Sequence, residues 1–428
     1  MTDSKRPHLR LFYGWYIVGA CFLISVYCSG VVNLGFTALI EPIVEEFHWS
    51  YALVSFAASI RGLESGLMAP VVGFLLDRWG PRKLIFAGAT IMGIGLLLLS
   101  RTSSLAMFYG SFILVSTAIS VSVGVVPMTV AGNWFRKRVS LATGIVVSGV
   151  AAGGILVPLI TWAIDAYDWR IAMVIFGLGA WAVIFPLALI VRHRPEQHGY
   201  LPDGEVSKTI DIDEVQTAAQ YEDVDVSAKQ ALKSRVFWHI AFGMVCSFIV
   251  ALAVLTHVMP YLSSIGVPRT VSGWVAGALP LMTIVGRLSA GWFGDIFDKR
   301  QVTATGMALL TMGIIIYNYV DVAGIWLLMV FVALFGIGYG SQVPMSVALI
   351  REYFGRVRLG TILGLATGVA YVGSLIGPPL SGWIYDVYGS YQGAWFATAG
   401  VAFAGMVSFI TAPPASRAIR IADKPINP

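Results

Sequence analysis

The hexapeptide Val126-Pro-Met-Thr-Val-Ala131 returns almost unchanged as Val343-Pro-Met-Ser-Val-Ala348, roughly 220 residues further along the chain. A second stretch, Gly73-Phe-Leu-Leu-Asp77, returns at nearly the same separation as Gly291-Trp-Phe-Gly-Asp295. Two matches with one spacing indicate that the chain contains two copies of a single structural unit.

A longer pattern repeats with the same spacing: Pro158-Leu-x-x-Trp-x-x-Asp-x-Tyr167 returns as Pro379-Leu-x-x-Trp-x-x-Asp-x-Tyr388. We therefore predict an N-terminal half over residues 1–191, a linker over 192–235 and a C-terminal half over 236–428. Parallel repeats of this kind are related by a pseudo-twofold axis along the membrane normal, an arrangement that transporters use for alternating access.

Composition places both halves in a lipid bilayer. Hydrophobic residues make up 57% of the chain and charged residues only 12%, whereas soluble domains have about 25% charged residues. The first apolar run, from Leu11 to Ile40, has no charge and is too long for a cleavable signal peptide. The runs are continuous rather than alternating, which excludes a β-barrel.

We therefore predict an all-α membrane protein with twelve transmembrane helices in two pseudo-symmetric six-helix halves. The helices are expected near 12–40, 51–76, 83–100, 105–132, 139–164, 170–191, 236–262, 270–295, 301–320, 323–350, 359–385 and 391–412.

Positive charge predicts the orientation. Lys and Arg gather in every second loop, whereas the alternate loops hold only Arg101, Arg170 and Arg269. The positive-inside rule then places both termini and the linker in the cytoplasm. The linker has an acidic middle, and Ser227-Ala-Lys-Gln230 at its end reads as a capping box that opens a short helix. We expect the linker simply to join the halves.

The stretch Gly73-Phe-Leu-Leu-Asp77-Arg78-Trp-Gly-Pro-Arg82-Lys83 resembles the helix 2–3 loop signature of the major facilitator superfamily. A weaker copy ends on Asp295 and its following loop. An Asp at a helix end can pair with loop arginines and face the positive N-terminus of a neighbouring helix. We interpret Asp77, Arg78, Arg82 and Asp295 as a conformational latch; the alternative is charge that only sets topology.

A narrower resemblance lies in Trp134-Phe-Arg-Lys-Arg-Val-Ser-Leu-Ala-Thr-Gly-Ile-Val-Val-Ser-Gly149 and Tyr13-Gly-Trp15. These segments resemble monocarboxylate transporters and the related oxalate/formate antiporters. The resemblance implies transport of small carboxylates, often with a proton. Asn33 stands where animal monocarboxylate transporters have a helix 1 Lys, and Thr283 where they have an Asp. Gly124 replaces a tyrosine of the oxalate carrier, which implies a roomier pocket.

Arg287 is the main candidate for binding substrate. It lies about 12 Å inside its predicted helix, where an arginine normally faces a cavity or a partner. The guanidinium can hold a carboxylate through two hydrogen bonds. Its repeat position is near Ala69, so it breaks the repeat, and it matches the helix 8 arginine of the resembling family. The alternative is a structural ion pair or a backbone anchor.

Three other ionisable residues lie within predicted helices. Arg61 and Glu64 share one face of helix 2. Either they neutralise each other, or Glu64 takes up a proton during transport, or Arg61 is a second anion contact. His257 in helix 7 is a further candidate for proton coupling, or a hydrogen-bonded cavity residue.

Helices 1, 4, 7, 10 and 11 flank the cavity in the resembling fold, which suggests further substrate contacts. We list Asn33 of helix 1 with aromatic and amide residues of the same helices: Tyr27, Tyr261, Tyr339, Gln342 and Tyr371.

Glycine patterns indicate close helix packing. They occur as Gly360-x3-Gly364-x3-Gly368 and Gly373-x3-Gly377 on helix 11 and as Gly149-x3-Gly153 on helix 5. Gly124 with Pro127 in helix 4, and the glycines before Pro344 in helix 10, suggest bends. None of them resembles a phosphate-binding loop.

We predict a secondary transporter of a small organic monocarboxylate that is coupled to protons by symport. Alternatives are a carboxylate antiporter, a transporter-like substrate sensor and, last, an exporter of hydrophobic cations. We expect no enzyme activity, metal, cofactor or nucleic-acid partner, because the sequence shows no catalytic or metal-ligand spacing. The expected form is a monomer in the plasma (cytoplasmic or inner) membrane, in contact with lipid.

Overall fold

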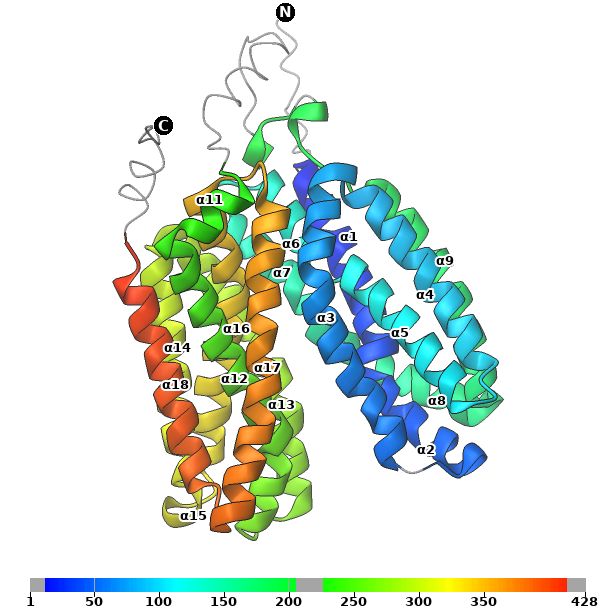
Figure 1. Cartoon of the computed structure of the whole chain (residues 1–428), viewed down its shortest axis with the longest axis vertical. Coiled ribbons are helices and arrows are strands. Elements are labelled where there is room, and N and C mark those ends of the chain that lie inside the picture. The colour runs from blue at the N-terminus through cyan, green and yellow to red at the C-terminus, as the bar shows by residue number, and fades with distance from the viewer. Residues whose placement is uncertain (1–11, 50, 199, 205–225, 414–428) are drawn as a thin grey trace, which may run out of the picture.

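The computed structural model describes residues 12–49, 51–198, 200–204 and 226–413, and every regular element in these ranges is helical. Figure 1 shows two helical bundles side by side, the first coloured blue to green and the second green to red. The chain passes from one to the other through the linker at one end of the molecule, which we call the linker end; α2 and α15 lie at the far end. The predicted all-α fold class is confirmed.

The N-terminal half contains six membrane-length rods, three of which are made of more than one helical segment. Its elements are α1 (Tyr13–Cys28), the π-helix η1 (Ser29–Leu34), α2 (Phe36–Phe47), α3 (Tyr51–Trp79), α4 (Pro81–Ser100), α5 (Leu105–Ser122), α6 (Val125–Trp134), α7 (Val139–Ala152), the 3-10 helix η2 (Gly153–Leu156), α8 (Val157–Tyr167) and α9 (Trp169–Ile190).

The C-terminal half contains six long helices and one short one, and it is preceded by the linker. The linker elements are the 3-10 turns η3 (Glu196–His198) and η4 (Pro202–Gly204) and the helix α11 (Ala228–Lys233). The half itself comprises α12 (Arg235–Ser264), α13 (Arg269–Ile296), α14 (Lys299–Asn318), α15 (Val320–Ala323), α16 (Leu327–Phe354), α17 (Leu359–Tyr388) and α18 (Gln392–Thr411).

Ten helical segments of the described chain are long and apolar enough to span a membrane. The two remaining rods are α3, with 29 residues, and α14, with 20. Both are less apolar; α3 carries Arg61, Glu64 and Asp77 along its length. They pack against α17 and against α16 and α18, respectively, as full members of the bundles. The described residues thus form twelve membrane-length rods.

Helix boundaries differ from the predicted ones where polar residues continue a helix. The first rod runs on to Phe47 rather than ending near residue 40, because Glu41, Glu45 and Glu46 extend it beyond the apolar run. Helix 4 breaks at Gly124, between α5 and α6, as the Gly–Pro pattern predicted. Helix 10, in contrast, stays unbroken through Pro344 as α16.

The predicted glycine contacts are confirmed. A Cβ added at Gly360 or Gly364 would lie within 3 Å of backbone oxygens of α3, and one at Gly373 or Gly377 would meet the backbone of α12 equally closely. One at Gly153 would lie 2.6 Å from the amide nitrogen of Gly30 in η1. No side chain fits at these crossings, so glycine is what allows the helices to approach.

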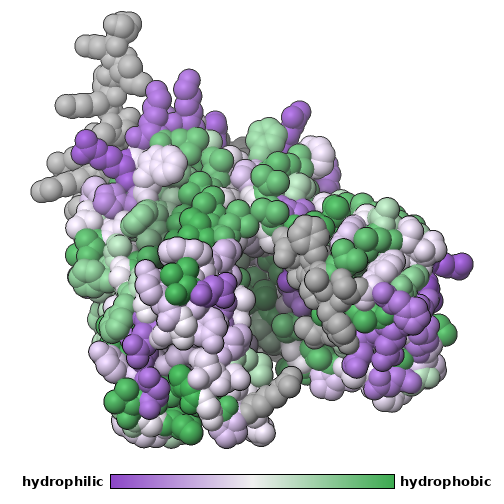
Figure 2. Space-filling view, turned by 60° about the horizontal axis from the view of Figure 1, so that its bottom comes forward, coloured by the Kyte–Doolittle hydropathy of each residue, from purple (hydrophilic) through white to green (hydrophobic). Residues whose placement is uncertain are grey.

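The two halves meet mainly along two crossings, α3 with α17 and α7 with α13. Smaller contacts join α6 and α7 to α16, and α6 to α17. They converge at the linker end and separate towards the far end (Figure 1). Figure 2, which brings the far end forward, shows a hollow between the two halves.

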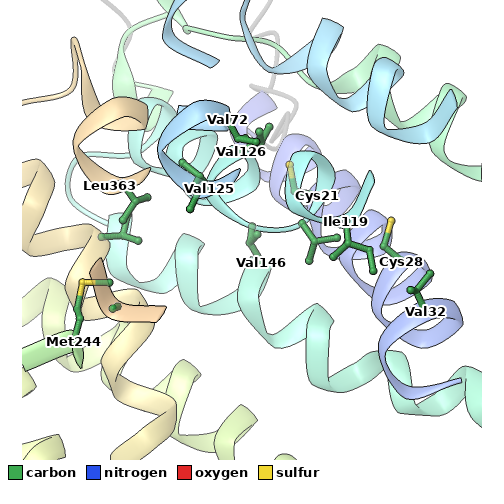
Figure 3. Close-up of a cluster of buried hydrophobic side chains, with 14 of the residues drawn as sticks. Cys21, Cys28, Val32, Val72, Ile119, Val125, Val126, Val146, Met244 and Leu363 are labelled. Atoms are coloured by element: carbon green, nitrogen blue, oxygen red, sulfur yellow. The ribbon is translucent and has the colours of Figure 1, made fainter. Parts of the chain in front are cut away.

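The apolar core holds all three cysteines. Cys21 and Cys28 of the first rod are buried and lie near Val32 and Ile119 (Figure 3). Cys246 is also buried, and all three are free thiols. The predicted capping box is present as well: Gln230 N–H donates to Ser227 Oγ, and Ser227 N–H donates to Gln230 Oε1, at the start of α11.

Candidate functional site

A cavity of about 110 Å³ lies between the halves, bordered by α6 on one side and α12, α16 and α17 on the other. Its walls are largely apolar; Val125, Met244 and Leu363, on three of these helices, are labelled in Figure 3. The break at Gly124 places that glycine in the wall, where it leaves room that a side chain would fill. The polar groups in the wall are Ser247, Tyr339, Gln342, Ser346, Thr367 and Tyr371.

Three of the predicted substrate contacts therefore line this cavity: Tyr339, Gln342 and Tyr371. The Gln342 amide group donates to the Gly338 carbonyl oxygen at 3.1 Å and to Ser341 Oγ at 2.9 Å. Its Oε1 atom is buried and accepts no hydrogen bond within the described residues. An acceptor left without a partner costs free energy, so it favours a site that receives a donor from a ligand or water.

Arg287 of α13 is buried at the junction of the halves, with 8% of its surface exposed. Its Nη1 group donates to the carbonyl oxygen of Val147 in α7 at 2.9 Å, which joins the C-terminal half to the N-terminal half. Its Nε atom is buried without a partner, and no ion pair within the described residues involves this guanidinium. Its charge acts on the hydroxyl of Tyr339 in the cavity wall.

Arg61 and Glu64 of α3 have separate partners. Glu64 Oε2 accepts from Ser120 Oγ at 2.9 Å, and Oε1 is buried without a partner. Arg61 Nη1 donates to the Val32 carbonyl oxygen at 3.5 Å, the outer limit of a hydrogen bond. Within the described chain, no ion pair joins the two residues, so the structure does not show the mutually neutralising pair.

Tyr371 connects these two groups of residues. It lies on α17 and interacts electrostatically with Arg61 and Glu64 of α3 as well as with Tyr339 of α16. Its Cβ atom would lie 2.8 Å from a Cβ added at Gly66 of α3, so the ring base packs directly on that helix. The ionisable residues of helix 2 therefore act on Tyr371, and Arg287 of helix 8 acts on Tyr339, the two tyrosines of the cavity wall.

Arg287, Arg61 and Glu64 are not among the residues that line this cavity, and four other predicted site residues also lie outside its wall. Tyr27 donates to the Phe176 carbonyl oxygen at 2.6 Å, and Tyr261 donates to that of Tyr317 at 3.0 Å, so each hydroxyl is used inside its own half. Asn33 donates to Ser29 Oγ within the π-helical segment. Tyr27 and Tyr261 were predicted from helix number and Asn33 from the family resemblance, and neither argument determines the side-chain direction.

His257 is the fourth. Its Nδ1 atom lies 3.1 Å from the Tyr391 hydroxyl, and its Nε2 atom lies 3.0 Å from the Pro378 carbonyl oxygen. Because the carbonyl can only accept, Nε2 carries a proton and Nδ1 accepts from Tyr391 in the neutral ring. Both nitrogens are thus used between α12, α17 and the start of α18.

The aspartates of the latch bind helix N-termini of the opposite half. Asp77 Oδ2 accepts from the Thr361 backbone N–H at 2.7 Å and from its hydroxyl at 2.6 Å, and Oδ1 accepts from the Gly360 N–H at 3.2 Å. Asp295 accepts from the backbone N–H groups of Ser140 and Leu141 at 2.9 and 3.1 Å. Both carboxylates therefore close the linker end by crossing between the halves.

Sequence reasoning expected each aspartate of this latch to face a helix N-terminus, but it did not say which helix, and it paired Asp77 with the wrong arginines. Arg78 and Arg82 are exposed, and the arginine whose charge acts on Asp77 is Arg194 of the linker. The repeat could have identified the helix N-termini that bind the two aspartates. Ser140 and Leu141 follow Arg138 at the same spacing at which Gly360 and Thr361 follow Arg358. No comparable signal marked Arg194, which lies outside the repeat.

Comparison with known proteins gives one family. The model of the Major Facilitator Superfamily matches residues 18–268 and 258–425. Monocarboxylate transporter 13 of Rattus norvegicus is 25% identical over 410 residues, covering 94% of this chain and 89% of that protein. The uncharacterized MFS-type transporter YcxA of Bacillus subtilis is 25% identical over 397 residues, covering 88% and 90%.

Solved structures support the same fold. The fucose:proton symporter FucP in the outward conformation has a TM-score of 0.69 at 13% identity, covering 93% of this chain and 99% of that chain. The proton:xylose symporter XylE has a TM-score of 0.70 at 15% identity, covering 94% and 96%.

Proposed function

The chain belongs to the Major Facilitator Superfamily, and we propose that this transporter carries a small organic monocarboxylate by alternating access, coupled to protons. The observation that carries the proposal is the buried Arg287 guanidinium, which has no carboxylate partner within the described chain and acts on a tyrosine of the central cavity. A buried cation without a counter-ion is costly, and a negatively charged substrate compensates it. The relatives named monocarboxylate transporters support the same substrate class.

The contact of Arg287 with Val147 suggests how binding is coupled to movement. That hydrogen bond links α13 to α7 and therefore spans the two halves. A substrate carboxylate that takes both Nη groups competes with the Val147 carbonyl oxygen, because a bidentate pair with an anion is stronger than one bond to a neutral acceptor. Binding thus removes one contact between the halves and lowers the cost of their rocking.

The positive-inside pattern supports a cytoplasmic location for the linker end and both termini. In that orientation, closure at the linker end corresponds to an outward-facing carrier. We place it as a monomer in the plasma (cytoplasmic or inner) membrane. Asp77 and Asp295 then act as the latch that must release before substrate leaves on the cytoplasmic side.

Glu64 is our proposed proton carrier. Its unpartnered Oε1 atom is a place for a proton, and Tyr371 and Ser120 provide neighbours that can exchange hydrogen bonds with it. Arg61 lies on the same face of α3 without an ion pair to Glu64, so protonation of Glu64 removes a negative charge and leaves the positive charge of Arg61 in place. Protonation would then favour an anion in the cavity, as symport requires.

Uptake by reconstituted proteoliposomes tests the proposal. Labelled short-chain monocarboxylates should enter saturably and faster when the interior is alkaline, whereas the corresponding amides, which match in shape but lack charge, should not enter. Equal transport of acid and amide would refute an anion site at Arg287. Stimulation only by internal carboxylate, with no response to pH, would show exchange instead of symport.

A further inference from the structure

The first part of the linker forms a strap across the linker end, made of the described residues 192–198 and 200–203. It begins firmly attached to the N-terminal half. The Trp134 indole N–H donates to the Arg192 carbonyl oxygen at 3.0 Å, and the Arg192 guanidinium lies 4.5 Å from the centre of the Tyr13 ring. These contacts hold the start of the strap against the N-terminal half directly after the end of α9.

The other end of the strap returns to the same half. The Tyr200 ring is stacked on Tyr13 and also contacts Trp134. Asp203 Oδ2 accepts from the backbone N–H groups of Arg136 and Lys137 at 3.0 and 2.7 Å, in the loop between α6 and α7. Asp203 has φ of 63°, which Asp and Asn tolerate better than other residues that have a side chain. Both ends of the strap are therefore part of the N-terminal half.

The middle of the strap binds the C-terminal half. Arg356 Nη1 donates to Glu196 Oε1 at 2.5 Å, with only 8% and 11% of the two side chains exposed. Arg194 Nη2 donates to the carbonyl oxygen of Val357 at 3.2 Å. Arg356 and Val357 lie in the loop between α16 and α17. This loop precedes α17, whose N-terminus binds the Asp77 carboxylate.

We propose that this strap is a third lock on the linker end, in which Glu196 and Arg194 hold the α16–α17 loop and keep the halves closed there. Because the strap is bound to one half at both ends and to the other half in its middle, the halves cannot part at the linker end without breaking the Glu196–Arg356 pair. The Asp77 and Asp295 contacts are symmetric, whereas the described residues contain a single strap of this kind. The strap thus gives the linker a part in closing the linker end.

The electrostatics agree with a lock that acts in one conformation. Glu196 and Arg356 are almost shielded from water in the closed form, where each is the counter-ion of the other. Parting the halves separates the two charges, and water must then solvate each one. Arg194 adds to the closure, since its charge also acts on Asp77. The proposal rests on alternating access and not on the identity of the substrate.

Distance measurements between spin labels test the lock without any substrate. Labels at Lys83 and Gln301, which are exposed near the linker ends of α4 and α14, report the separation of the halves. Glu196→Gln should raise the ratio of open to closed populations about tenfold, the value of a charge-assisted hydrogen bond. Asp203→Asn, which weakens one attachment of the strap to the N-terminal half by removing the charge of the acceptor, should shift it in the same direction by a smaller amount. Gln197→Ala, at the exposed neighbour of Glu196, should leave the distances unchanged.

Two further variants make the result independent of folding. The exchange Glu196→Arg with Arg356→Glu should restore much of the closed population that Glu196→Arg alone loses. Cysteines at positions 196 and 356, joined by a bifunctional thiol reagent, should hold the linker end closed and stop transport until the link is cleaved. Unchanged distances in Glu196→Gln, or full transport by the cross-linked carrier, would overturn the proposal.

Discussion

The two halves of the chain are alike at the linker end and different in the middle of the membrane. At the linker end, Asp77 and Asp295 each bind the N-terminus of a helix in the opposite half, at positions related by the repeat. In the middle, helix 2 carries Arg61 and Glu64 whereas helix 8 carries Arg287, and neither set has a counterpart in the other half. Symmetric contacts serve a movement that both halves share, whereas a single substrate needs an asymmetric site.

The largest effect is expected for the asymmetric set. Arg287→Ala should reduce carboxylate uptake at least about a hundredfold, because it removes the charged donors from a site shielded from water. Initial uptake rates in proteoliposomes check this, with folding verified by gel filtration. Arg101→Ala, at an exposed arginine, is the matched control. Uptake near the wild-type rate in Arg287→Ala would assign the guanidinium to holding Val147 alone.

The symmetric pair should respond equally. Asp77→Asn and Asp295→Asn should each shift the conformational equilibrium towards opening at the linker end by about tenfold, because the charge that faces a helix N-terminus is lost. Accessibility of a single cysteine introduced at the linker end of the cavity measures the shift. Asp386→Asn, at an exposed aspartate of α17, is the control. A strong effect of one variant and none of the other would show that the two aspartates do not have equivalent roles in the two halves.

Glu64→Gln should separate proton coupling from substrate binding. The variant should still bind and exchange carboxylate, but it should lose the several-fold stimulation of uptake by an alkaline interior, since the amide cannot take up a proton. Uptake measured over a series of imposed pH gradients gives the result. Glu41→Gln, at an exposed glutamate of α2, should keep the wild-type response. A preserved response in Glu64→Gln would move the coupling site elsewhere, with His257 the next residue to test.

The smallest expected effect is a pH dependence of stability that arises in the strap, a segment outside the repeated parts of the sequence. Burial, together with the charge of Arg194, lowers the pKa of His193 to about 4. The unfolded chain binds a proton below about pH 6.5 and the folded chain only near pH 4, so stability falls as the pH drops through this window. The loss at pH 5 is about 1–2 kcal/mol.

His193→Gln should remove this acid sensitivity. Thermal unfolding of the detergent-solubilised protein at pH 7 and pH 5 provides the measurement, and the difference between the two midpoints should be smaller for the variant. His257→Gln serves as a comparison inside the membrane region. An equal pH dependence in wild type and His193→Gln would show that His193 is not responsible.

Local sequence features determined most of the architecture. The length of each apolar run predicts a membrane-spanning helix, and the repeated Gly73–Asp77 and Gly291–Asp295 segments reveal the two halves. Both features can be read from short stretches of sequence without knowing which helices pack together. The glycines of helix 11 predicted a close helix crossing in the same way, because a helix face without side chains can be recognised without knowing which helix packs against it. The first rod was longer than predicted, since glutamates can continue a helix outside the lipid.

Tertiary structure alone decided which side chains meet. Tyr371 interacts electrostatically with both Arg61 and Tyr339, and Arg194 rather than Arg82 acts on Asp77, although these partners are far apart in the sequence. Tyr27 and Tyr261 turned into their own halves because the direction of a side chain depends on how its helix is rotated within the bundle. The sequence states which residues are charged or apolar, whereas only the packing of the helices decides which of them are buried and which of them meet.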